Sequence, residues 1–161
     1  MDRPRISFCH GQEHHVQTHH HMLVLADDLA AIPDRVQTLL DQEQPVIGKQ
    51  FSFQLDKHHI TCWILPPDFA YPSIMRRLLR SIALVLVIYT PQGISGIESW
   101  HAEFQPQGQM ISLIDDPLLL EQMNQFLGTI TTAAGLENML IQSCNQLAAD
   151  TENSSGYHGV C

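Results

Sequence analysis

Length, composition and charge limit the classes of protein that this sequence can encode. The chain has 161 residues, 44% of them hydrophobic and 16% charged, which suits one globular domain with a full core. The formal net charge at pH 7 is −9, and all eight Lys and Arg residues lie at or before Arg80. This distribution lacks the basic surface of a nucleic-acid-binding protein, and the apolar stretches are too short to cross a bilayer. We therefore expect a cytoplasmic protein with no nucleic-acid partner and no membrane insertion.

The two ends of the sequence differ in composition from its middle. Residues 1–20 are polar and rich in histidine, and residues 151–161 are rich in Ser, Gly and Asn without periodicity. We expect both to be flexible tails and residues 21–150 to form the folded domain. The four cysteines include no Cys-x-x-Cys pair, so we expect reduced thiols, with Cys62 and Cys144 in the core.

A strand and a helix begin the expected domain. Residues 22–25 are a short apolar run typical of a strand. Ile32, Val36 and Leu39 then recur at helical spacing, and Pro33 suits a first helical turn.

Two β-rich runs follow at close spacing. Residues 51–55 alternate between apolar and polar side chains, and residues 60–65 form a second run after only four residues. Four residues cannot form the crossover that parallel strands need, so an antiparallel hairpin is predicted. We expect His58 and His59 to lie in its turn, exposed to solvent.

The next helix has an apolar stripe and a positively charged stripe. Ser73 can cap it. The apolar stripe comprises Ile74, Met75, Leu78 and Leu79, and the opposite stripe comprises Arg76, Arg77 and Arg80. These three arginines are the most concentrated positive charge on an acidic sequence, which makes them candidate contacts for an acidic protein partner; the alternative is a solvated helix face.

The second half of the domain alternates regularly between strands and helices. Strands are predicted over residues 83–89, 109–114 and 128–132. Three helices are predicted between and after these strands. The first begins near Ser95 and the third near Leu136. The second begins at Asp115 or Asp116 with Pro117 and bears Leu119, Met123 and Phe126. The prediction is a single three-layer α/β domain: a mixed six-stranded sheet with five helices distributed over both faces.

Three segments carry a resemblance to a known family. Residues 80–89, 110–116 and 131–138 resemble, in order and spacing, the fourth strand, the guanine-recognition loop and the base-pocket loop of Ras-like small GTPases. The resemblance covers about residues 22–149 and implies a Ras-like topology.

The functional residues of that family are replaced here. Its phosphate-loop glycines fall on Ala26 and Ala31, its lysine on Ile32 and its Mg²⁺-binding hydroxyl on Pro33. Its Asp-x-x-Gly falls on residues 64–67 and its Asn-Lys-x-Asp on residues 115–118. We therefore expect a pseudo-GTPase: no enzyme, no bound nucleotide and no cofactor, but a protein-binding or assembly module in a larger intracellular complex.

Two other functions remain as alternatives. Asp27 and Asp28, with Asp68 and Thr90, resemble the acidic pair and its partners in receiver domains, although a receiver needs a helix where only residues 56–59 stand. The plainer interpretation makes Asp27 and Asp28 helix-start carboxylates. An enzyme of unrecognised chemistry is the other alternative, although no nucleophile motif is visible.

The histidine-rich N-terminal run has ligand types at separations that suit a metal ion. The weak candidates are His14, His15, His19, His20 and His21, and the alternative is an ordinary polar tail.

Overall fold

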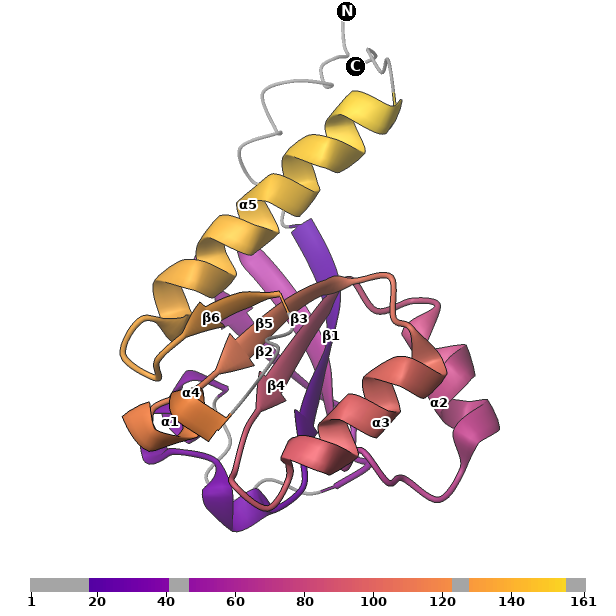
Figure 1. Ribbon diagram of the computed structural model, residues 1–161. Coiled ribbons are helices and arrows are strands. Elements are labelled where there is room, and N and C mark those ends of the chain that lie inside the picture. The colour runs from indigo at the N-terminus through magenta and orange to yellow at the C-terminus, as the bar shows by residue number, and fades with distance from the viewer. Residues whose placement is uncertain (1–17, 41–46, 123–127, 156–161) are drawn as a thin grey trace, which may run out of the picture.

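Strands and helices alternate along the chain in the computed structural model shown in Figure 1. The structure describes residues 18–40, 47–122 and 128–155. The elements are β1 (Thr18–Ala26), the 3₁₀ helix η2 (Leu29–Ala31), α1 (Asp34–Leu39), β2 (Phe51–Leu55), β3 (His58–Leu65), α2 (Pro72–Leu79), β4 (Leu84–Ile88), α3 (Ile94–Phe104), β5 (Gln109–Leu113), α4 (Pro117–Gln122), β6 (Thr129–Thr131) and α5 (Leu136–Ser155).

The strands form one mixed sheet in the order β2-β3-β1-β4-β5-β6. All neighbours are parallel except β2 and β3, which pair antiparallel from Phe51 opposite Cys62 to Leu55 opposite His58. This confirms the predicted α/β fold with its hairpin. Only Asp56 and Lys57 separate the two hairpin strands, so the helix that a receiver domain needs there is absent and the receiver alternative is wrong.

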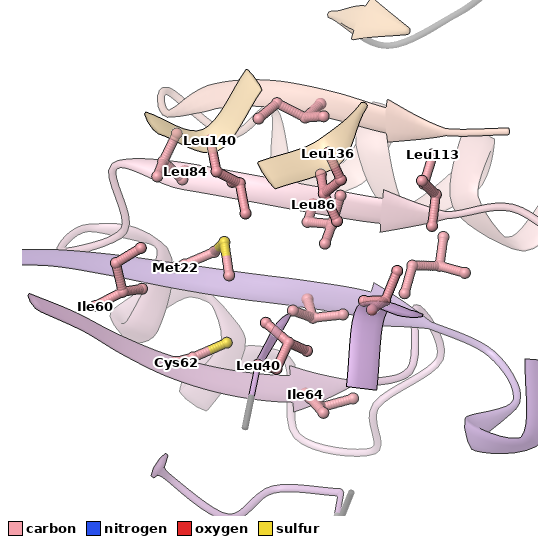
Figure 2. Close-up of a cluster of buried hydrophobic side chains, with 14 of the residues drawn as sticks. Met22, Leu40, Ile60, Cys62, Ile64, Leu84, Leu86, Leu113, Leu136 and Leu140 are labelled. Atoms are coloured by element: carbon pink, nitrogen blue, oxygen red, sulfur yellow. The ribbon is translucent and has the colours of Figure 1, made fainter. Parts of the chain in front are cut away.

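Helices cover both faces of the sheet because its central strands are buried on both sides. Every residue of β4 is buried, as expected for a parallel strand between two helical layers. One core cluster joins α1 and α5 to the sheet, and the other joins α2, α3 and α4 to the opposite face. In Figure 2, Leu136 and Leu140 of α5 point toward the side chains of Leu84 and Leu86.

The ends of the ordered domain extend beyond the predicted boundaries. β1 begins at Thr18, so Thr18, His19 and His20 belong to a strand and not to the expected tail, because they pair with the start of β3. α5 continues to Ser155, past the expected end at residue 150. Within the described ranges, no helix is both long and apolar enough to cross a membrane.

Two helix starts differ from those predicted. α2 begins at Pro72 and not after a Ser73 cap, because the fixed φ of proline and its missing N–H suit the first helical position. α3 begins at Ile94, one residue before Ser95. In the helix expected to follow Pro117, Met123 and Phe126 lie outside the described residues.

Candidate functional site

The carboxyl ends of the parallel strands are where this type of sheet usually binds ligands. Asp27 follows β1 and Thr90 follows β4. The Thr90 hydroxyl lies 3.1 and 3.0 Å from the two carboxylate oxygens of Asp27 and donates to them, while the Gly93 N–H donates to Thr90 Oγ1 at 3.1 Å. A Cβ on Gly93 would lie 2.8 Å from Asp27 Cγ. Asp27 thus fills the space between the two loops and holds them together.

The other carboxylates at this end hold backbone N–H groups. Asp28 accepts from the Ala30 N–H at 2.9 Å and caps η2. Asp115 accepts from Ala133 at 2.8 Å, and Asp116 accepts from Leu118 at 3.0 Å. The helix-start interpretation holds for Asp28, whereas Asp27 is a hydrogen-bond acceptor between loops.

The position that matches the phosphate-loop lysine is hydrophobic. Ile32 is 2% exposed and belongs to the core cluster beneath α1. The loop before α5, which resembles the base-pocket loop, borders a pocket of about 410 Å³. Its lining includes one cation, Arg35, and one anion, Glu137.

At the opposite end of the strands, side chains that bind metals converge. His20 comes from β1, His58 is the first residue of β3, and Cys144 lies in α5. His20 Nε2 is 3.3 Å from His58 Nδ1, and one possible ligand atom from each of the three residues lies within 4.8 Å of the other two. We call these three residues the His–His–Cys cluster.

Two polar side chains orient the cluster. The His58 Nε2–H donates to Asn145 Oδ1 at 2.8 Å, which leaves the Nδ1 lone pair of His58 directed at His20. Thr18 Oγ1 contacts His58 Nδ1 and lies 3.1 Å from His20 Nε2. The hydroxyl therefore bridges the two imidazoles.

Burial favours the neutral forms of two members of the cluster, His20 and Cys144. His20 is 7% exposed, and His58 and Cys144 are fully buried. Burial, reinforced by the neighbouring His58, lowers the pKa of His20 to about 4. Burial raises the pKa of the Cys144 thiol to about 11.

The structure separates the histidines that the sequence grouped together. His14 and His15 lie outside the described residues. His19 and His21 point to the face opposite His20, where His19 lies 5.2 Å from the His59 ring and His21 stacks on Trp63 at 5.8 Å. Strand alternation, and not helical spacing, decides this division.

Sequence reasoning missed two members of the cluster. The expectation that His58 is exposed in the turn is wrong, because the turn uses only Asp56 and Lys57 and His58 pairs with Leu55. Counting back by twos from the buried Ile60 would have placed His58 on the core face. Cys144 was correctly expected in the core, but nothing in the sequence places it beside two histidines.

The third candidate region is the exposed side of α2. Arg76 is already engaged: it pairs with Glu103 at 3.3 Å and lies 5.1 Å from the centre of the Phe104 ring. Arg77 and Arg80 are exposed and have no partner among the described residues. Ile74 was expected on the buried stripe but is 46% exposed, because Met75, Leu78 and Leu79 face the sheet.

Comparison with known proteins supports the fold and goes no further. No family model matches the sequence, and no curated protein matches it. A solved structure, the FeoB G-domain from Methanococcus jannaschii, matches 80% of this chain and 99% of its own length. The TM-score is 0.54 and the sequence identity 9%. This likeness shows a small GTPase-like fold, but it does not bear on the degenerate character expected from the sequence.

One expectation must be corrected on this finding. Because each nucleotide-contacting motif is replaced, we expect from the sequence that this chain is not an enzyme. The solved structure with a similar fold is the FeoB G-domain, and this finding is in conflict with the exclusion of an enzyme. We therefore withdraw the exclusion of an enzyme.

Proposed function

We propose that this chain is a protein-binding module of a larger complex and that it binds through one side of α2. The binding surface comprises Tyr71, Ile74, Arg77 and Arg80, and we call it the α2 surface. Tyr71 is 60% exposed and Ile74 46% exposed, beside two arginines without a partner in the described part of the chain. This combination of exposed apolar and cationic side chains is the observation that supports the proposal.

The composition of the α2 surface indicates the chemistry of its partner. Tyrosine and arginine are the residue types that most often dominate binding energy at protein interfaces. An arginine fork binds carboxylates through two parallel hydrogen bonds, so an acidic protein surface is the matching partner. Exposed Ile74 and Tyr71 add apolar area that an adjacent hydrophobic side chain of the partner would cover.

A shallow pocket beside the α2 surface supports the same partner class. It has a volume of about 270 Å³ and lies between the ends of α2 and α3. Arg76 and Arg80 line it together with the apolar side chains of Leu79 and Phe104. Arg76 already pairs with Glu103, whereas Arg80 has no partner within residues 18–40, 47–122 and 128–155 and can bind an incoming carboxylate.

Site-specific crosslinking tests the proposal. A photoreactive residue replaces Tyr71, and the crosslinked products are compared in cells that produce the protein. We expect a discrete protein product that disappears in the Arg77→Glu/Arg80→Glu variant, because charge reversal repels an acidic partner. The matched control is Lys49→Glu/Lys57→Glu, which changes the net charge equally at exposed positions away from α2 and should retain the product. A product that persists after reversal at α2, or the absence of any product, rejects the proposal.

A further inference from the structure

The His–His–Cys cluster combines donors that bind one class of metal ion. Neutral imidazole nitrogens and thiolate sulfur suit Zn²⁺ and related divalent transition metals, whereas Mg²⁺ and Ca²⁺ prefer oxygen ligands. The cluster holds two imidazoles and one thiol, all from buried residues. We propose that His20, His58 and Cys144 form a binding site for a divalent transition-metal ion, Zn²⁺ foremost.

The spacing of the two imidazoles fits tetrahedral coordination. Zn–N bonds of about 2.0–2.1 Å at tetrahedral angles place two ligand nitrogens roughly 3.3–3.4 Å apart. His20 Nε2 and His58 Nδ1 are 3.3 Å apart in the structure. The sulfur of Cys144 needs only a small approach, since one ligand atom from each of the three residues already lies within 4.8 Å of the other two.

The surroundings of His58 are those of a metal ligand. Histidines that bind metals usually donate their second ring N–H to an acceptor, which fixes the tautomer and directs the free lone pair at the ion. His58 does this through Asn145 Oδ1 at 2.8 Å. Asn145 follows Cys144 in α5, so one segment supplies both a ligand and the group that orients another.

The fourth coordination position has a polar neighbour. Three protein ligands leave one place on a tetrahedral ion for water or another oxygen. Thr18 Oγ1, near both imidazoles, can hydrogen-bond a water there. Binding would release the thiol proton of Cys144 to solvent and form the metal–thiolate bond.

A metal ion at this site would link the adjacent strands β1 and β3 to α5, which lies far from them in the chain. His20 and His58 come from adjacent parallel strands, and Cys144 comes from the long helix that crosses one face of the sheet (Figure 1). One hydrogen bond, from His58 to Asn145, already joins β3 to α5 at this end of the sheet. Metal binding is therefore expected to raise the melting temperature.

Cobalt titration tests the site on the full chain after chelation and dialysis. Co²⁺ replaces Zn²⁺ in such sites and gives a thiolate-to-metal charge-transfer absorption that carboxylate or histidine ligands alone do not give. We expect one Co²⁺ per chain with that absorption, displaced by Zn²⁺. Cys144→Ala should abolish the absorption and weaken binding at least tenfold.

Matched variants separate the cluster from other ligands. Cys62→Ala removes the other buried thiol of the same core and should leave the absorption unchanged. A variant with His14, His15, His19 and His21 all replaced by Gln removes the other four candidate histidines of the N-terminal run and should also retain the absorption. The proposal is overturned if the wild type gives no thiolate absorption, if Cys144→Ala retains it in a folded protein, or if the four-histidine variant loses all binding. Circular dichroism establishes folding for each variant.

Discussion

The two ends of the parallel strands use polar residues in opposite ways. At the carboxyl end, Thr90 is half-buried, Asp27 and the neighbouring acidic residues are exposed, and each completes the hydrogen bonds of a loop or helix start. At the amino end, His20 and His58 are buried and bond to each other and to Thr18, and His58 also bonds to Asn145.

This contrast shows that the fold and the location of reactive side chains are separate properties. The carboxyl end is where such a sheet usually binds ligands, yet the amino end here gathers the buried metal-ligand types. A GTPase-like fold therefore does not decide where a member places its reactive side chains. The burial of polar groups also predicts that the amino end is the more sensitive to substitution.

The largest effect is expected at Gly128, which leads into β6 at the amino end of the sheet. Its φ is +70°, and an added Cβ would lie 1.9 Å from the Met110 carbonyl oxygen. Gly128→Ala should lower the free energy of unfolding by about 3 kcal/mol or more, because backbone must move. Gly48→Ala is the control: its φ is +81° but the space is open, so we expect about 1 kcal/mol. Equal losses in urea unfolding would contradict the packing explanation.

The second effect concerns the His–His–Cys cluster itself. In the metal-free protein, His58→Ala should cost about 2–3 kcal/mol, since it leaves a cavity and removes the partner of Thr18 and His20. His59→Ala is the control at the next position, where the side chain points to the other face and is half-buried. Chemical denaturation measures both. If His59→Ala lowered the free energy of unfolding more than His58→Ala, the expectation that the buried face of β3 is the more sensitive one would be wrong.

The third effect is the pH dependence of the metal-free protein in chelator. The folded pKa of His20 is about 4, below its ordinary 6.5, so the unfolded chain binds more protons between these values. The His20 contribution to stability is complete above pH 6.5 and falls as the pH drops toward 4. Between pH 8 and pH 5 it should decrease by about 2 kcal/mol. The difference in slope between wild type and His20→Gln isolates this contribution, and identical slopes would refute it.

The smallest effect is expected at the carboxyl end. Thr90→Val keeps the side-chain shape but removes the hydroxyl that donates to Asp27. Because these hydrogen bonds are exposed to solvent, water can replace them, and we expect a loss of about 1 kcal/mol or less. Thermal unfolding of this variant beside His58→Ala compares the two ends directly. A loss at Thr90 as large as that at His58 would show that the carboxyl end is equally dependent on its polar contacts.

Much of the fold follows from local sequence patterns. The alternation of apolar and polar residues in β2 and its short connection to β3 predict an antiparallel hairpin, which the structure contains. The continuous apolar run of β4 predicts a strand buried on both faces, and every residue of β4 is buried. The predicted starts of α2 and α3 are less accurate, because Pro72 and Gly93 mark these helix starts although serines nearby are also suitable caps. The α2 arginines were identified from helical spacing, whereas the exposure of Ile74 depends on where the helix packs.

The sequence by itself determined the order of elements, the antiparallel hairpin and the division of most side chains between core and surface, because periodicity and connection length are local properties. Only the tertiary structure brought His20, His58 and Cys144 together. They come from two strands and a helix far apart in the chain, and their meeting depends on the parallel register of β1 with β3 and on the position where α5 crosses them. The packing of α5 and the pairing of strands far apart in the chain depend on contacts across the core, which local periodicity and connection length do not specify.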